Sequence, residues 1–276
     1  MAKQEHDEAR AGWWPGALIW LGGVLLLVPE APLIAALVCV YLVLGGLPLV
    51  GLLVALLIIG FMARAAALHL ARIALEQGRT SAAGALVQVA LALYPWSADG
   101  LALQGALALA SGEPELAAAR LRRAIALLPG QASFYAALSG ALLELGRPSE
   151  AAAAARQALA LDERCAIAHL YLAEADQALG APATTIEDRL RAGLVVATDP
   201  ATEATIRCAL AGHLLGEQRF AEATLTLHGA EALLPRCQAG YQAALRLRLA
   251  TLLLAQGQIE RAREYFGIVA LDPQRL

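Results

Sequence analysis

Residues 98–131 read ADGLALQGALALASGEPELAAARLRRAIALLPGQ, and residues 132–165 read ASFYAALSGALLELGRPSEAAAAARQALALDERC. Each stretch is 34 residues long and consists of a small, apolar run, a Gly-x-Pro turn and a second small, apolar run. Glycines recur at the same spacing, at Gly78, Gly112, Gly146 and Gly180. A fixed period of this length is typical of a solenoid, in which each unit buries its apolar face only against its neighbours.

The period recurs at other positions of the chain. Alanines follow three of the glycines by five and by twelve positions, and prolines follow two of them by seventeen, at Ala83, Ala117, Ala151, Ala90, Ala124, Ala158, Pro95 and Pro129. A 34-residue unit with Gly, Ala, Ala and Pro at these offsets resembles the tetratricopeptide repeat. The resemblance implies an all-α solenoid of helix pairs that binds other proteins and rarely performs chemistry.

The repetitive part of the chain divides into six units if each recurring glycine ends the first helix of a pair. The approximate spans are 64–97, 98–131, 132–165, 166–201, 202–240 and 241–276. The second and third units fit best, although Ala108 and Ala155 stand where the family usually has a large residue. The later units drift: Arg189 takes a large position of the fourth, and Gly216 and Gly257 mark the turns of the last two. Six units exceed the roughly three that a stable stack needs.

A different kind of sequence precedes the repeats. Hydrophobic residues make up 59% of the 276 residues and charged residues 16%, and Glu30 is the only residue expected to be charged between positions 11 and 63. A hydrocarbon core takes about 20 helical residues to cross, and two apolar stretches, 13–28 and 33–62, approach or exceed this length. We therefore predict a polar tail at 1–12, a transmembrane helical hairpin at 13–63 with its turn near 29–32, and the solenoid at 64–276.

The second apolar stretch, residues 33–62, carries two further expectations. Gly45-Gly46-Leu47-Pro48 predicts a kink within it, and a re-entrant piece is the alternative interpretation. No glycine, proline or polar linker separates Met62 from Arg64, so we expect one helix from about Pro48 to Gln77 that enters the first repeat.

Basic residues predict how the hairpin is oriented. Lys3 and Arg10 precede it and Arg64, Arg72 and Arg79 follow it, whereas its turn has no basic residue. Cytoplasmic segments that flank membrane helices carry an excess of Lys and Arg. The sequence therefore predicts a multi-pass protein of the inner (cytoplasmic) membrane with its repeat domain facing the cytoplasm.

The resemblance also suggests where a partner would bind, because repeats of this family present a concave surface from the first helix of each pair. The corresponding positions are Asp99, Ala102, Ala106, Leu109, Ser133, Ala136, Gly140, Leu143, Ile167, Leu170, Glu174 and Gln177. This predicted groove is mostly small and apolar and suits a helix or an apolar strand, although the alanines could equally serve only helix formation. The Lys, Asn and Arg clamp with which some family members grip a peptide carboxylate is absent.

The sequence has no motif of a known catalytic or metal site. It contains no Gly-rich phosphate loop, nucleophile elbow or zincin helix. Cys165 and His169 do not belong to a four-ligand set, so no metal or cofactor is expected. The net charge of −3 and the lack of a basic stripe argue against a nucleic-acid partner.

The sequence therefore predicts a membrane-anchored scaffold without enzymatic activity. Its expected partners are proteins, above all membrane proteins, and the lipid bilayer, and homo-oligomers are compatible with the pattern. It would serve as a subunit or assembly factor of a larger membrane complex, or as an independent anchor that recruits soluble partners. Some cytochrome c biogenesis proteins look similar, but they have a long loop between their membrane helices where this chain has only Pro29 to Pro32.

Overall fold

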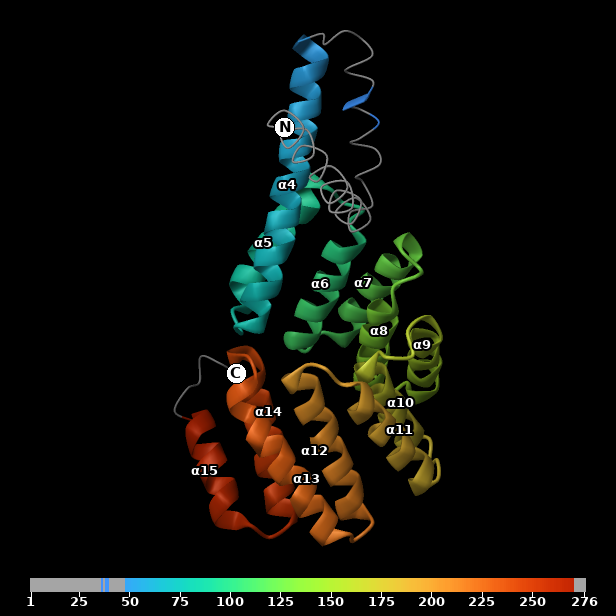
Figure 1. Ribbon diagram of the computed structural model, residues 1–276, viewed down its shortest axis with the longest axis vertical. Helices are drawn as coiled ribbons and strands as arrows, with labels where there is room; N and C mark the ends of the chain where they lie inside the picture. The colour runs from blue at the N-terminus through green and yellow to red at the C-terminus, as the bar shows by residue number, and fades with distance from the viewer. Residues whose placement is uncertain (1–35, 37, 40–47, 271–276) are drawn as a thin grey trace, which may run out of the picture. The chain divides into compact units, whose positions relative to one another are not determined.

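A computed structural model of the protein describes residue 36, residues 38–39 and residues 48–270 (Figure 1). Within these residues, every regular element from position 48 onwards is helical: α4 (Pro48–Glu76), α5 (Thr80–Leu93), α6 (Ala98–Ala110), α7 (Pro114–Leu127), α8 (Ala132–Glu144), α9 (Pro148–Leu161), α10 (Ala166–Ala178), α11 (Ala183–Val196), α12 (Pro200–Gly216), α13 (Phe220–Leu233), the 3₁₀ helix η1 (Leu234–Arg236), α14 (Ala239–Ala255) and α15 (Ile259–Ala270). The chain divides into two compact units, Met1–Ala63 and Arg64–Leu276.

The second unit is a solenoid of helix pairs. From the C-terminal part of α4 onwards, each helix is followed by a partner that returns along it, and successive pairs stack on one another (Figure 1). The stack is held by fully buried leucines and alanines, such as Leu121, Leu172 and Ala151, which are at most 1% exposed. The predicted all-α solenoid is therefore confirmed for the described residues.

Of the part of the chain predicted to enter the membrane, the structure describes residue 36, residues 38–39 and the residues from Pro48 onwards. α4 is a single helix that runs through Met62 and Arg64 without a break. Within the described residues, one segment, Gly51–Glu76, is long and apolar enough to cross a membrane, with a mean hydropathy of 2.3. The predicted first membrane helix and the predicted kink before Pro48 lie outside the described residues.

The same hydrogen bond closes the turn within each of the six pairs. In the second pair the N–H of Glu113 donates to the carbonyl of Ala108 at 2.8 Å, and the equivalent bonds of the other five are 2.8–2.9 Å long. This helix ending requires a residue with positive φ, and glycine takes that position in five pairs. The exception is Gln218, with φ 60°. Gly216, predicted to end the first helix of the fifth unit, is the last residue of α12, but the position of positive φ lies two residues later, at Gln218.

Replacing Gln218 by glycine should stabilise the solenoid. A side chain in the left-handed region costs roughly 1–2 kcal/mol, and glycine removes this cost. Glycine also raises the conformational entropy of the unfolded chain, which offsets part of the gain. We therefore expect a net gain in stability of about 0.5–1 kcal/mol. Thermal unfolding followed by circular dichroism measures it. Glu217→Gly is the matched control, because Glu217 has φ −84° and gains nothing from glycine. Equal melting temperatures for Gln218→Gly and the native chain would contradict the assignment.

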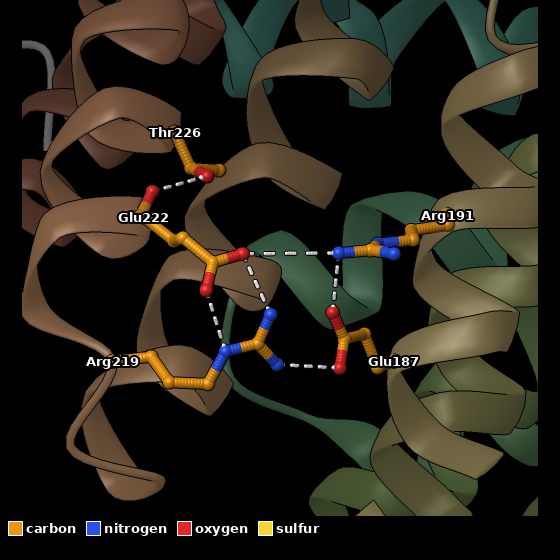
Figure 2. A network of polar contacts seen from close by, with 5 residues as sticks. All are labelled: Glu187, Arg191, Arg219, Glu222 and Thr226. Carbon is orange, nitrogen blue, oxygen red and sulfur yellow. Dashed lines mark hydrogen bonds and ion pairs between the residues drawn. The ribbon is translucent and has the colours of Figure 1, made fainter. Parts of the chain in front are cut away.

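Charged side chains join the fourth and fifth pairs at their surface (Figure 2). The Arg219 guanidinium donates from Nη1 to Glu187 Oε2 at 2.7 Å and from Nη2 to Glu222 Oε2 at 2.6 Å. Arg191 contacts Glu187 from the same helix, α11. The hydrogen bond from Arg219, assisted by the charge of Arg191, holds the pKa of Glu187 below its usual range. The side chain of Glu187 is only 13% exposed, so this contact is partly shielded from water.

The lowered pKa of Glu187 predicts a pH-dependent contribution to stability. The folded state stabilises the ionised form of Glu187. Its contribution to stability is therefore complete above the unfolded pKa of about 4.3, and it is lost as the pH falls through the lower pKa of the folded state. Glu187→Gln should cost about 1 kcal/mol at pH 7, and this deficit should shrink towards zero on acidification. Melting curves across pH would show it. Glu260→Gln, which removes an 82% exposed carboxylate, should leave stability unchanged at every pH.

Candidate concave binding site

A candidate site is a cavity of about 740 Å³ on the face formed by the first helices of the pairs. It lies among the end of α4, α10, α12 and α14, and its lining consists of Glu76, Ile167, Tyr171, Asp199, Ala201, Thr202, Thr205, Gln238, Tyr241, Ala244, Leu245 and Arg248. A second cavity of about 220 Å³ extends to α6 and α8 and shares Tyr171, Thr205 and Arg248 with the first. The shared residues make the two cavities one concave site, which we call the inner cavity.

The side chains of the inner cavity carry hydroxyl groups and charges. Arg248 Nη2 lies 3.8 Å from Glu174 Oε1, which joins α14 to α10. Burial raises the pKa of Glu174, although the charge of Arg248 opposes this rise. Burial and the nearby charge of Glu174 raise the pKa of Tyr171 to about 12, so this phenol stays protonated and available as a hydrogen-bond donor at neutral pH. The site therefore offers aromatic surface and hydrogen-bonding groups to a bound polypeptide.

A backbone contact between distant repeats borders the inner cavity. Gly240, in the first turn of α14, packs against the turn that follows α4. A Cβ atom added to Gly240 would lie 2.7 Å from the carbonyl oxygen of Glu76 and 2.7 Å from the amide nitrogen of Gly78. Only a residue without a side chain permits this approach. Because Glu76, Gln238 and Tyr241 line the cavity beside it, this Gly78–Gly240 seam closes one side of the site.

Half of the twelve residues predicted for the groove line the inner cavity, and the other half do not. Those that line the inner cavity are Leu109, Gly140, Leu143, Ile167, Leu170 and Glu174. Asp99, Ala102, Ala106, Ser133 and Ala136 do not line it, and Gln177 borders a separate depression of about 260 Å³. Ala136 is 0% and Leu170 is 1% exposed, so both belong chiefly to the core. Gly140 is already covered, because an added Cβ would lie 2.8 Å from the ring of Tyr171.

Of the polar residues discussed for the site, the sequence predicted only Glu174. Tyr171, Thr205, Tyr241 and Arg248 were not among the predicted groove residues, yet they line the inner cavity. Tyr171 was within reach of the pattern, because it lies on the first helix of the fourth unit between two predicted positions. The lining residues on α12 and α14 could not be predicted from the pattern. These two helices have 17 residues each, whereas α6, α8 and α10 have 13, so the 34-residue register is lost there.

A further cavity of about 400 Å³ lies among α5, α6 and α7 and has mostly polar walls. Gln104 lines it where the next two units have the buried leucines Leu138 and Leu172. Its Oε1 atom is buried without a hydrogen-bond partner among the described residues. The contact between the first and second pairs thus lacks a large apolar side chain that the following contacts have.

We expect Gln104→Leu to stabilise the protein. An unsatisfied buried acceptor costs about 1–3 kcal/mol, and a leucine at this position removes that cost while adding apolar contact. The gain should reach about 1 kcal/mol and appear as a higher midpoint in urea unfolding. Gln88→Leu changes an exposed residue of the same cavity and should give no such gain. A midpoint that falls for Gln104→Leu would show that the amide has a partner such as bound water.

Comparisons with known proteins agree with this architecture. A family model described as "Tetratricopeptide repeat" matches residues 103–158 and 137–182. A thermophilic TPR protein of Thermus thermophilus is similar at 25% identity and a TM-score of 0.55, covering 69% of this chain and 99% of that one. The structure of pilF from Pseudomonas aeruginosa is similar at 21% identity and a TM-score of 0.53, covering 78% and 94%. A tetratricopeptide repeat protein from Parabacteroides merdae has 17% identity and a TM-score of 0.56, covering 75% and 77%.

No curated protein matches the chain in sequence. The helix pairs make the protein an α-solenoid. The family model and the similar solved structures support tetratricopeptide repeats as its building units. The structures below 25% identity show the fold alone. Among the described residues, no group of three or more His, Cys, Asp or Glu side chains is placed to hold a metal ion. Cys165 ends the loop before α10, and the Nε2 atom of His169 lies 3.1 Å from the carbonyl oxygen of Glu163.

Proposed function

We propose that this protein is a membrane-anchored scaffold that holds a protein partner in its inner cavity, as a subunit or assembly factor of a membrane complex. The observation that carries the proposal is the inner cavity itself, to which the first helices of all six pairs contribute and whose lining includes tyrosine, arginine, carboxylate and hydroxyl groups. Tyrosine and arginine are enriched where protein partners bind, because each combines a large contact surface with hydrogen bonding. Tetratricopeptide repeats make a protein partner the natural occupant.

Membrane anchoring is supported by the apolar part of α4. Leu53, Leu57 and Ile59 are each more than half exposed in this helix. Only 17% of the most apolar window of Gly51–Glu76 is buried, whereas the core helix of a soluble protein is mostly buried. An exposed apolar helix of this length requires lipid or protein around it. The basic residues that flank the apolar region favour the inner membrane, with the repeats in the cytoplasm.

The proposal is tested by purifying the tagged full-length protein from its native membranes in mild detergent. A membrane-protein partner that co-purifies in fixed stoichiometry is expected. Ala244→Arg should abolish this capture, because Ala244 is an exposed residue of α14 that lines the inner cavity. Ala232→Arg is the matched control, since Ala232 is an exposed alanine of α13 outside the cavity.

The outcomes separate the proposal from its alternative. A soluble partner that is lost with Ala244→Arg would favour an independent anchor that recruits cytoplasmic proteins. Equal capture by both variants would reject the inner cavity as the binding site. Extraction of the protein from membranes by high salt alone, without detergent, would reject the membrane anchor.

A further inference from the structure

The two edges of the solenoid differ in the residues that they expose. At the turns within the pairs, charged residues follow the residue of positive φ, as at Arg79, Glu113, Arg147 and Arg219. At the connections between pairs, the second helices end in exposed apolar side chains instead. Leu93, Leu127, Leu161 and Val195 stand there at intervals of 34 residues and are 50%, 42%, 41% and 86% exposed.

The connections themselves change character from one unit to the next. The α5–α6 connection has Tyr94 and Trp96, which are 39% and 63% exposed. One period later, the α7–α8 connection has Leu128, 40% exposed, and Gly130. A further period along, the α9–α10 connection has the exposed charged residues Asp162 and Arg164. Over the first three connections the equivalent positions therefore change from aromatic to apolar to charged, whereas the fourth has Val196 and Thr198 there.

The aromatic connection is attached to the residue at which the apolar segment ends. Arg64 follows Met62 by two positions, and it is only 8% exposed. Its Nη1 atom donates to Ser97 Oγ at 3.1 Å, and its guanidinium carbon lies 5.6 Å from the centre of the Tyr94 ring. The rings of Tyr94 and Trp96 meet edge to face, with their centres 6.4 Å apart. Tyr94, Trp96 and Ser97 are thereby fixed beside the first charged residue after the apolar segment.

We propose that the Tyr94–Ser97 connection, together with Leu128, rests in the headgroup layer of the lipid bilayer, while the Asp162–Arg164 connection lies in water. This inference rests on the membrane anchoring proposed above. Tryptophan and tyrosine favour the membrane interface because an apolar ring carries a polar N–H or O–H group. Arg64 marks the depth at which the chain leaves the hydrocarbon, and its contacts with Tyr94 and Ser97 bring that connection to the same depth.

Tryptophan fluorescence of the full-length protein in vesicles of phosphatidylcholine and phosphatidylglycerol tests the inference. Trp13, Trp14 and Trp20 are replaced by phenylalanine so that Trp96 is the only tryptophan left of four. We expect blue-shifted emission and stronger quenching by lipids brominated near the headgroup than by lipids brominated at the chain end. Flotation of the vesicles on a density gradient establishes that the protein is bound.

The repeat supplies matched controls at equivalent positions. In a chain that also carries Trp96→Phe, the single tryptophan is moved one period along with Gly130→Trp or two periods along with Arg164→Trp. Gly130 has open space around an added Cβ, so the substitution fits. Quenching by headgroup-brominated lipid should persist at position 130 and vanish at position 164. Circular dichroism checks that each variant is folded. The variant that keeps Trp96 as its single tryptophan carries no substitution in the solenoid.

Each outcome decides between the two proposals. Flotation with quenching at positions 96 and 130 but not 164 supports the inference. Flotation with a fully water-exposed Trp96, or with equal quenching at all three positions, overturns it and leaves the anchor intact. Failure to float rejects the membrane anchor and the inference with it.

Discussion

Asp176→Leu should be among the most destabilising single substitutions in the solenoid. The carboxylate of Asp176 is buried on α10, with its side chain 8% exposed, and Arg189 Nε of α11 donates to Oδ2. Arg156 of α9 approaches Oδ1 at 3.7 Å. Removing one partner of a buried ion pair costs about 3–5 kcal/mol, and because Arg189 keeps a third of its side chain in water we expect about 2–3 kcal/mol. Thermal unfolding of the full-length protein in detergent measures the loss.

The second variant of the series tests the physical reason. Asp176 and Arg189 are equivalent to Leu142 and Ala155 of the preceding unit. Asp176→Leu combined with Arg189→Ala therefore rebuilds a pair that already packs in this solenoid, and it should recover most of the lost stability. Arg189→Ala alone should destabilise, because it removes the hydrogen bond to the buried carboxylate and leaves only the longer contact of 3.7 Å with Arg156. Additive losses in the double variant would show that the two side chains act independently.

The same positions show what the sequence could predict. Ala108 and Ala155 depart from the family pattern, and each looked like a missing large residue. In the structure Ala108 shares a core cluster with Leu121, and Ala155 shares it with Leu142. In the second unit the small residue is on the first helix, and in the third unit it is on the second helix. Each pair therefore keeps one large side chain and one small one. The fourth unit replaces this pair with Asp176 and Arg189 and retains complementarity through charge.

Single positions could not reveal this compensation, because the fold constrains the volume and charge of a pair and not of each member. The all-α solenoid and its turns followed from the period, since glycine is favoured wherever the chain needs positive φ. The residue of positive φ in the fifth turn was not predicted, because Gln218 takes a conformation for which the pattern expects glycine. The inner cavity was predicted only in part, since Tyr241 and Arg248 belong to α14, where the longer helices shift the register. The lining of a concave site depends on contacts between units, which the repeat pattern of one unit does not contain.

Gly240→Val should open the Gly78–Gly240 seam. The added Cβ would overlap the backbone atoms of Glu76 and Gly78 at 2.7 Å, and backbone atoms at the end of α4 have no rotamer by which to withdraw. Overpacking of this kind costs typically about 1–3 kcal/mol. Because neighbouring pairs stay in contact through their own cores, helical content should remain, while the distance between the turn after α4 and the start of α14 increases.

Spin labels on Gln77→Cys and Gln238→Cys would measure that distance by pulsed electron resonance, in a chain whose four native cysteines are replaced by serine or alanine. Gly212→Val is the matched control, because an added Cβ at Gly212 meets only the side chain of Leu252, at 3.4 Å, which can move. It should leave the label distance unchanged. If Gly240→Val keeps the native distance, the seam is not set by the glycine contact. If it widens the distance and also abolishes partner capture, closure of the seam is part of how the inner cavity holds its partner. A widened distance with unchanged capture would mean that the lining residues, above all Tyr171 and Arg248, suffice for binding.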